Sequence, residues 1–162
     1  MYRVGMGYDI HPLEKGRKLV LGGVTVEKEM GLSGHSDGDA VMHAVIDSLL
    51  GACGMDSIGE LFPETDEYRN ADSSVLLKSA FSLLKDRKNL KIINIDIIVI
   101  TSYVKISEIK NSIKNNLSEI LKTETAQINV KGKSGNSLGI GDRGIEVMCT
   151  VLADIDVPGG NL

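Results

Sequence analysis

The sequence predicts a single α/β or α+β domain in which helices cover one face of a mixed β-sheet. Three observations lead to this fold class. Segments with strand periodicity and segments with helix periodicity alternate along the chain. The length of 162 residues is close to that of one domain, so residues 1–162 are expected to fold as a unit. A long β-branched run at residues 91–101 is typical of a strand inside a sheet.

The first elements are a strand and a hairpin. Residues 3–11 alternate around two glycines and predict an opening strand. Residues 18–23 and 24–26 predict a hairpin, because two adjacent glycines, Gly22 and Gly23, separate two apolar runs.

A helix is expected to follow the hairpin. Ser36 and Asp39 have the spacing of a capping box, which marks a helix start. Gly51 is suited to the C-terminal cap, so the helix should end near it. The residues expected on its apolar face are Val41, Ala44, Val45, Ser48 and Leu49.

The remaining elements alternate between helix and strand. A loop over residues 59–70 should lead to a second helix that Asp72 caps, and a third helix should cover residues 106–120. The run at residues 91–101 predicts an interior strand covered on both faces. Residues 127–131 predict a short strand, and residues 145–151 alternate as expected for a closing strand.

Composition narrows the function classes. The chain has 18 Lys and Arg against 22 Asp and Glu, a net charge of −4, which argues against a general nucleic-acid binder. Its two cysteines are too few for a disulfide framework and fit a reducing compartment. No apolar run is long enough to span a membrane, and the first residues do not form a signal peptide. We therefore expect a cytoplasmic globular domain without a membrane or nucleic-acid partner.

The three histidines, His11, His35 and His43, all fall in the first quarter of the chain. Asp9 and His11 are two apart on the first strand, so both side chains leave the same face. A helix packed on that strand would bring His43 to them from two turns inside the helix. One carboxylate and two imidazoles suit zinc, and three protein ligands leave a fourth position open, as in catalytic sites. The alternative is a chance D-x-H spacing with His43 as a half-buried, hydrogen-bonded side chain.

Residues 35–39 lie where a loop enters the first helix. Capping accounts for Ser36 and Asp39 but leaves His35 and Asp37 unexplained. A histidine just before a helix N-terminus is well placed to contact an anion held by free N–H groups. Capping alone is the alternative interpretation.

A glycine-rich segment, residues 131–144, follows the short strand. Its backbone N–H groups could form a nest for phosphate, with Lys133 and Arg143 adding positive charge. The segment is not a P-loop, because the required earlier glycine would stand at Gln127. A flexible hairpin with no ligand is the alternative.

Three blocks together resemble one enzyme family. These blocks are R-V-G-x-G-Y-D-I-H, the segment G-L-S-G-H-S-D-G-D-A-V-M-H-A-V-I-D-S-L-L-G, and I-G-E-L-F-P-E-T-D, followed later by N-V-K-x(8)-G-x-x-R-G. They are similar to the 2-C-methyl-D-erythritol 2,4-cyclodiphosphate synthases over residues 3–153. The resemblance implies a lyase of non-mevalonate isoprenoid biosynthesis. Such an enzyme converts 4-diphosphocytidyl-2-C-methyl-D-erythritol 2-phosphate to the cyclic diphosphate and releases CMP.

The resemblance also implies an assembly and a set of cofactors. It implies a homotrimer with active sites between neighbouring subunits, a Zn²⁺ ion and a second divalent cation, Mg²⁺ or Mn²⁺. By position, Asp9, His11 and His43 match the zinc ligands, and His35 and Ser134 match catalytic residues.

Further residues match the substrate site in three groups. The residues near the metal and the methylerythritol are Asp9, His11, His35, Ser36, Ser57, Ile58, Gly59, Phe62, Pro63, Glu64, Thr65 and Asp66. The loop around cytidine and its phosphates is Thr101, Ser102, Tyr103, Val104, Lys105, Ile106 and Ser107. The other wall of the nucleotide and diphosphate site is Lys133, Ser134, Gly135, Asn136, Ile140 and Arg143.

Four positions depart from the family pattern. Ser134 replaces a threonine but keeps a hydroxyl that can donate. Asn136 replaces the glutamate that usually binds the second cation. Ser57 replaces an aspartate, and Ile140 replaces a phenylalanine near the nucleotide. Two other functions fit the same residues: a zinc phosphoesterase that uses metal-bound water, and a metal-stabilised nucleotide-binding module.

Overall fold

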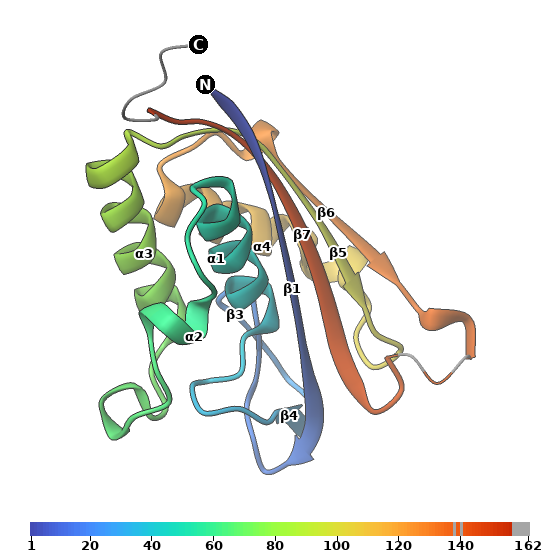
Figure 1. Cartoon of the computed structure of the whole chain (residues 1–162). Coiled ribbons are helices and arrows are strands. Elements are labelled where there is room, and N and C mark those ends of the chain that lie inside the picture. Colours follow the sequence, from blue (N-terminus) through green and yellow to red (C-terminus); the bar gives the residue numbers. More distant parts are fainter. Residues whose placement is uncertain (138, 140, 157–162) are drawn as a thin grey trace.

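The computed structural model describes residues 1–137, 139 and 141–156, and its core is the expected mixed β-sheet (Figure 1). The strand order is β4-β1-β7-β5-β6. Neighbouring strands are antiparallel except β5 and β6, which are parallel. The bounds are β1 Tyr2–Lys15, β4 Met30–Leu32, β5 Lys91–Ile100, β6 Ile128–Lys133 and β7 Gly144–Asp154.

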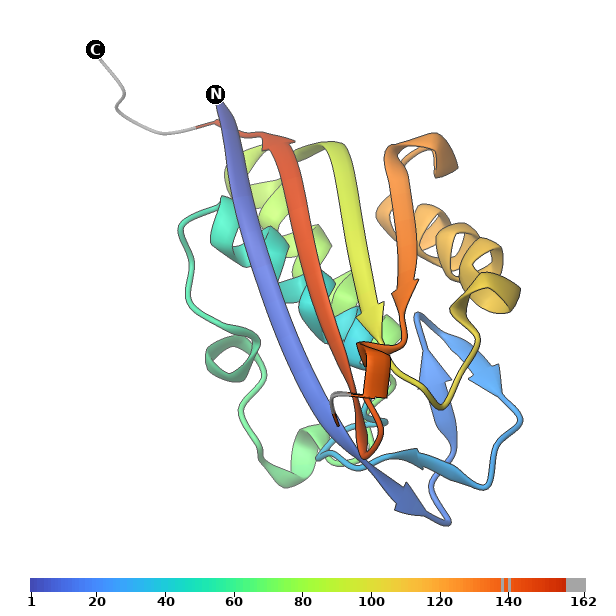
Figure 2. The same cartoon turned by 90° about the vertical axis from the view of Figure 1, so that its right-hand side faces the viewer.

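Helices cover one face of this sheet, as the sequence predicts. Helix α1 (Ala40–Ala52) packs on β1 and β7, and α4 (Ile106–Leu121) packs on β6. Helix α3 (Ser73–Lys88) packs mainly on α1, farther from the sheet. In the view of Figure 2 the helices lie behind the strands, and the other face of the sheet is open. Among the described residues, no helix is long and apolar enough to cross a bilayer.

The first helix begins three residues later than the capping box predicts. Asp39, rather than Ser36, is the N-cap, and its carboxylate accepts hydrogen bonds from the backbone N–H groups of Val41 and Met42, both at 3.1 Å. The Ser36 hydroxyl instead accepts a bond from the backbone of Gly38. His43 is therefore the fourth residue of α1, one turn from its start and not two.

The predicted hairpin is confirmed and docks on the start of α1. It consists of β2 (Leu19–Leu21) and β3 (Val24–Val26), which form a separate two-stranded sheet. The turn residues Gly22 and Gly23 have φ of 57° and 73°, a pair of values that favours glycine in a two-residue hairpin turn. Their N–H groups donate to the Asp39 carboxylate at 2.8 and 2.7 Å.

Other sequence predictions need correction. Strand β1 extends beyond residue 11 and pairs with β4, which the sequence did not predict. The expected loop at residues 59–70 contains a short helix, α2 (Ile58–Leu61), and a 3₁₀ turn, Asp66–Tyr68. Strand β5 is not covered on both faces. One face is buried at Ile95, Ile97 and Val99, but the alternate positions are half-buried or exposed because no helix packs on that side.

The uncovered face of β1 is apolar. Its outward side chains are Tyr2, Val4, Met6, Tyr8 and Ile10, which are 70%, 64%, 74%, 47% and 51% exposed. Met148 of β7 stands opposite Tyr8 and is 41% exposed. Monomeric proteins rarely leave such a contiguous apolar surface in water.

The first residue of the chain lies beside the end of the last strand, β7. The Met1 ammonium group lies 2.7 Å from the Asp154 carboxylate and 2.8 Å from the carbonyl oxygen of Ile155. Figure 1 shows the N-terminus beside the last part of β7, far from the turn that joins β1 to the hairpin.

Two glycines bring α1 unusually close to β1. A Cβ atom on Gly5 would lie 1.9 Å from the carbonyl oxygen of Ser48, and one on Gly7 would lie 2.0 Å from that of Ala44. These distances are shorter than any tolerated contact, so only glycine fits at either position. The close packing places the next inward residues of β1, Asp9 and His11, beside the helix.

The change Gly7→Ala should separate α1 from β1, because the backbone atoms that its Cβ would meet cannot rotate away. We expect a loss of about 1–3 kcal/mol in the free energy of unfolding, the usual cost of overpacking, measured by urea denaturation. The control is Gly51→Ala in α1, whose nearest atom would lie at 3.7 Å. It should be neutral or stabilising by up to about 1 kcal/mol. Equal stabilities for the two variants would contradict this account of the packing.

Candidate active site

Asp9, His11 and His43 converge on one point between β1 and α1. The distances are 2.9 Å from Asp9 Oδ2 to His11 Nε2, 3.0 Å from Asp9 Oδ2 to His43 Nδ1, and 3.2 Å from His11 Nε2 to His43 Nδ1. Ligand atoms about 2.0–2.1 Å from a tetrahedral ion lie roughly 3.3 Å apart. The trio could therefore hold a metal ion after small adjustments.

The hydrogen bond made by the other ring nitrogen of His11 is consistent with metal binding by the trio. His11 Nδ1 lies 2.5 Å from the backbone carbonyl oxygen of Ser33. A carbonyl oxygen only accepts, so Nδ1 carries a hydrogen, and whenever the ring is neutral the lone pair on Nε2 faces the trio. A histidine that binds a metal commonly donates its second N–H to such an acceptor. The donor set thus fits a divalent ion.

The three side chains are also coupled electrostatically. Burial alone would raise the pKa of Asp9, but hydrogen bonds and charge from His11 and His43 outweigh it and lower the pKa to about 2. Burial alone would lower the pKa of His11, yet the Asp9 carboxylate and the Ser33 carbonyl raise it. Asp9 is therefore ionised at neutral pH, the form that binds a metal.

A cavity of about 190 Å³ opens beside the trio. His35 lines this cavity, and its Nε2 lies 2.7 Å from the carbonyl oxygen of Thr65. Four of the residues predicted for this part of the site do not line the cavity: Ser57, Pro63, Thr65 and Asp66. The predicted substrate residues that do are Asp9, His11, His35, Ser36, Ile58, Gly59, Phe62 and Glu64.

Asp47 was not among the predicted site residues. It follows His43 by one helical turn, and its carboxylate accepts a 2.6 Å bond from the backbone N–H of Ile58. This bond holds the first turn of α2, and with it Ile58 and Gly59, at the edge of the cavity. Asp47 lies four residues after His43 on the same helix, and this spacing could have indicated from the sequence that both side chains lie on one face.

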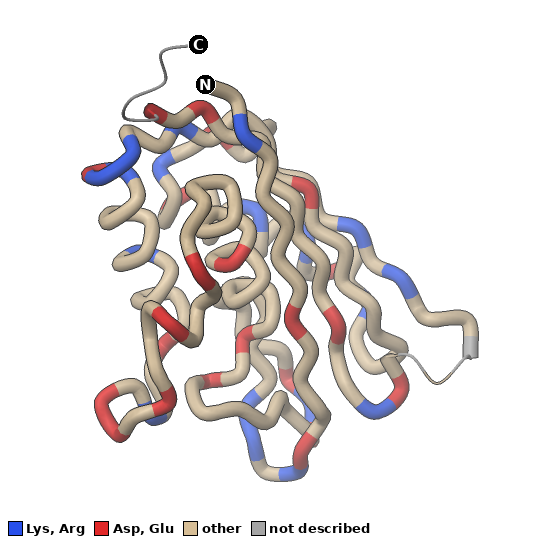
Figure 3. The backbone as a smooth tube through the Cα atoms, in the orientation of Figure 1, with Lys and Arg blue, Asp and Glu red and all other residues tan. Residues whose placement is uncertain are grey.

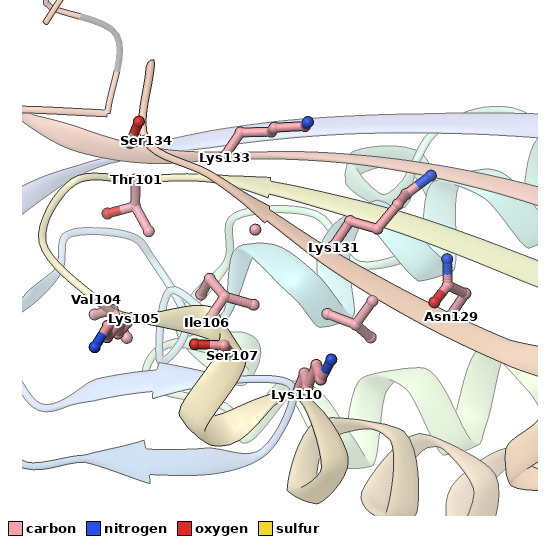
Figure 4. Close-up of a pocket in the computed structure, with 12 residues that line it drawn as sticks. Thr101, Val104, Lys105, Ile106, Ser107, Lys110, Asn129, Lys131, Lys133 and Ser134 are labelled. Carbon is pink, nitrogen blue, oxygen red and sulfur yellow. The ribbon is translucent and has the colours of Figure 1, made fainter. Parts of the chain in front are cut away.

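A second cavity, of about 510 Å³, lies between β6 and the start of α4 (Figure 4). Four lysines line it: Lys131 and Lys133 on β6, Lys105 just before α4, and Lys110 within α4. Figure 3 shows basic positions along β6, and Lys131 among them is ion-paired with Asp96 of the neighbouring β5 at 2.5 Å. The cavity therefore suits an anionic ligand. The predicted residues that line it are Thr101, Val104, Lys105, Ile106, Ser107, Lys133 and Ser134.

The glycine-rich segment is bonded to the loop that begins at Thr101. Thr101 N–H donates to the carbonyl oxygen of Lys133 at 2.8 Å, and Ser102 donates from its N–H to Gly141 and from its hydroxyl to Asp142. Ser102 and Tyr103 do not line the cavity. Gly135 and Asn136 both have positive φ.

Arg143 does not join Lys133 as the sequence analysis expected. It lines a separate hollow of about 380 Å³ together with Ile10, Pro12 and Glu146. Ile140, expected near the nucleotide, lies outside the described residues.

The residues expected to bind one substrate therefore line three separate hollows, and His11 lines both the cavity of the trio and the hollow of Arg143. The trio is on β1 and α1, whereas the lysine-lined cavity is on β6 and α4. Strands β7 and β5 lie between β1 and β6, which separates the two strands by about 14 Å. Within one chain, the cavity of the trio and the lysine-lined cavity are separate pockets.

Comparison with known proteins identifies the family. The model of the YgbB family matches residues 2–155, nearly the whole chain. The chain belongs to the YgbB family. The resemblance found in the sequence is confirmed, since curated relatives of this YgbB chain are named 2-C-methyl-D-erythritol 2,4-cyclodiphosphate synthase.

Individual relatives cover the YgbB fold from end to end. The synthase of Petrotoga mobilis is 54% identical over 160 residues, 96% of this chain and 99% of the relative. The Plasmodium falciparum IspF CDP complex has a TM-score of 0.83 and 38% identity, covering 96% of this chain and 97% of the other. The bifunctional IspDF of Campylobacter jejuni has a TM-score of 0.90 and 37% identity, covering 96% of this chain but 42% of the other.

Removing one ligand of the trio should release the metal. We expect protein purified without chelator to contain about one zinc per chain, and His43→Ala to lose most of it, as measured by atomic emission. His35→Ala is the control, because His35 lines the same cavity but lies outside the trio. Full zinc in His43→Ala would show that the ligands are assigned wrongly.

Proposed function

We propose that this protein converts 4-diphosphocytidyl-2-C-methyl-D-erythritol 2-phosphate to 2-C-methyl-D-erythritol 2,4-cyclodiphosphate and CMP. The observation that carries the proposal is the trio at Asp9, His11 and His43 beside a cavity, in a chain matched over its length by synthases of that name. The enzyme is a phosphorus–oxygen lyase of isoprenoid biosynthesis by the non-mevalonate route. Its substrate and CMP are its small-molecule partners.

The reaction requires no nucleophile from the protein. An oxygen of the substrate's own 2-phosphate attacks the β-phosphorus, and the bond from that phosphorus to the bridging oxygen of CMP breaks. Cys53 and Cys149 are both buried, and burial raises the pKa of Cys149 to about 12, so it is not a thiolate at neutral pH. What the protein supplies is positioning and charge neutralisation.

Asp9, His11 and His43 would hold a zinc ion with one position open to the substrate. The chemistry supplied by zinc at such a site is Lewis acidity, which orients and polarises phosphate oxygens. His35, at the mouth of the cavity, and Ser36 contact the substrate phosphate. The methylerythritol occupies the pocket that Ile58, Gly59 and Phe62 line, with Ser57, Pro63, Glu64, Thr65 and Asp66 around it.

The lysine-lined cavity takes the cytidine diphosphate part of the substrate. A solved relative described as a CDP complex has the same fold. Lys105 and Lys133 neutralise phosphate charge, which a chain of net charge −4 especially needs. The Ser134 hydroxyl, exposed beside this cavity, donates to the charge that develops on the transferring phosphate.

The cavity of the trio and the lysine-lined cavity are the two halves of one active site. These half-sites are joined by assembly into a homotrimer with active sites between subunits. The two cavities of one chain lie on different strands of the sheet, so the trio of one subunit would face the lysines of its neighbour. The apolar face of β1, from Tyr2 to Ile10, supplies the surface that subunits bury against each other. Arg143, at the edge of that face, then approaches the site of an adjoining subunit.

A second divalent cation, Mg²⁺ or Mn²⁺, offsets charge on the diphosphate. Asn136 offers a neutral amide oxygen where the family pattern has a carboxylate. Magnesium commonly keeps several waters and binds substrate phosphates, so the diphosphate and water hold most of its coordination. The enzyme works in the cytoplasm, without a membrane or nucleic-acid partner.

A phosphorus NMR time course with the diphosphocytidyl substrate tests the function directly. We expect the cyclic diphosphate and CMP to appear together. Linear phosphates would indicate a phosphoesterase instead. An unchanged spectrum together with CMP binding would indicate a nucleotide-binding module.

Mixing two inactive variants tests the interface site. We expect His43→Ala and the double variant Lys105→Ala/Lys133→Ala each to be nearly inactive, since each lacks one half-site. Co-expressed in equal amounts, they should regain about a quarter of wild-type activity, the share of interfaces with both halves intact. The control mixes His43→Ala with Asp9→Ala, which damage the same half and should restore nothing. Activity no higher than that of this control would place both halves in one subunit.

The change Asn136→Glu should tighten the second cation site. We expect the half-saturating Mg²⁺ concentration to fall roughly tenfold, equivalent to about 1.4 kcal/mol, in titrations of activity. Asn136→Gln has the same side-chain length as Glu but no charge and should leave the titration unmoved. If Asn136→Glu has no effect while Asp142→Asn abolishes the response, Asp142 supplies the carboxylate instead.

A further inference from the structure

The second nitrogen of His43 faces buried hydroxyls rather than a backbone carbonyl. His43 Nε2 lies 3.0 Å from Ser73 Oγ and 3.1 Å from Ser36 Oγ. Ser73 is the first residue of α3 and is fully buried. The metal-facing atom, Nδ1, is on the opposite side of the ring, so whatever sets the state of Nε2 also sets Nδ1.

Asp37 determines which way the Ser73 hydroxyl points. Ser73 Oγ donates to Asp37 Oδ1 at 2.5 Å, and the Ser73 backbone N–H donates to Asp37 Oδ2 at 3.1 Å. A carboxylate only accepts, so the hydroxyl hydrogen is committed to Asp37. Toward His43, therefore, Ser73 can present only a lone pair.

This arrangement decides the hydrogen position on His43. If Nε2 carried a lone pair, it would face a lone pair of Ser73 at 3.0 Å, which is repulsive. Nε2 therefore carries a hydrogen and donates it to Ser73. In the neutral ring this leaves the lone pair on Nδ1, the atom that lies 3.0 Å from Asp9 Oδ2 in the trio. The Ser36 hydroxyl accepts a bond from the Gly38 backbone N–H. Because the Ser73 hydrogen is committed to Asp37, Ser36 is the donor in its 3.5 Å contact with Ser73 Oγ, so Ser36 also presents a lone pair to His43 Nε2.

We infer that Ser73, held by Asp37, is a positioning residue that directs His43 Nδ1 to the metal. The inference rests on the proposed metal site at Asp9, His11 and His43. It adds a hydroxyl-mediated link between a carboxylate and a ligand histidine, whereas His11 is oriented by the carbonyl of Ser33. Such outer partners typically change metal affinity by about 10–100-fold.

The link also connects the metal site to the loop around the substrate cavity. Ser73 opens α3 directly after the segment at residues 62–72, and the backbone N–H of Asp37 donates to the carbonyl oxygen of Ala71. The backbone N–H of Asn70 donates to the carbonyl oxygen of His35 at 2.8 Å. The Asp37–Ser73 pair therefore holds the ligand histidine and the end of this loop together.

Zinc affinity measured against a chromophoric chelator tests the role of Ser73. We expect Ser73→Ala to bind zinc about 10–100-fold more weakly than wild type. The matched control is Ser74→Ala, which changes the next residue of α3 and keeps the backbone bond from Ser74 N–H to Asp72. It should bind zinc as wild type does. Equal affinity in Ser73→Ala and wild type would overturn the inference.

Imidazole proton NMR of zinc-loaded, ¹⁵N-histidine-labelled wild type provides a test that needs no variant. We expect a slowly exchanging Nε2–H on His43 with a nuclear Overhauser contact to the Ser73 β-protons. Absence of that protected proton, or its presence on Nδ1, would overturn the inference. If wild type binds no zinc at all, the proposed metal site fails first, so the two failures are distinguishable.

Discussion

The contact of α1 with β1 at Gly5 and Gly7 is the constraint on which the site depends. Backbone carbonyl oxygens of α1 occupy the space where side chains of these two residues would stand. The helix axis therefore lies closer to the strand than any larger residue allows. Because the strand continues with Asp9 and His11 on the same face, this proximity brings both side chains to His43 and forms the candidate metal site. A shift of the helix by the width of one methyl group would open the cluster.

Helix α1 organises more than its own ligand. At its start, the Asp39 carboxylate binds the turn of the hairpin, and one turn beyond His43 the Asp47 carboxylate binds the start of α2. Asp37, just before the helix, holds Ser73 at the start of α3. Three carboxylates on or next to one helix thus set the positions of the surrounding segments. These carboxylates serve mainly as acceptors for backbone N–H groups, which explains how Asp39 can be fully buried without a paired cation.

Much of the fold and of the candidate site could be predicted from local patterns in the sequence. Strand alternation alone places Asp9 and His11 on one face, and the helix periodicity around His43 supplies the third residue of the candidate metal site. Longer-range features were not readable. A capping pattern at Ser36 and Asp39 does not reveal which residue is the cap, since both side chains can accept. The apolar run in β5 predicts a strand buried on both faces, although within a single chain helices cover only one face of this strand. The division of the expected substrate residues among separate hollows depends on strand order, which local patterns do not encode.

The meeting of Met1 with Asp154 has a consequence for gene fusion. A polypeptide joined ahead of Met1 would leave the fold at the end of the sheet away from Asp9 and His11. At 3.3 Å per residue these lie about 26 and 33 Å along the strand from Met1. Fusion would replace the ammonium group by an amide and remove its ion pair with Asp154. That pair is half exposed on both sides, so its loss costs little. A segment attached at this end would therefore lie away from the trio and disturb only an exposed ion pair.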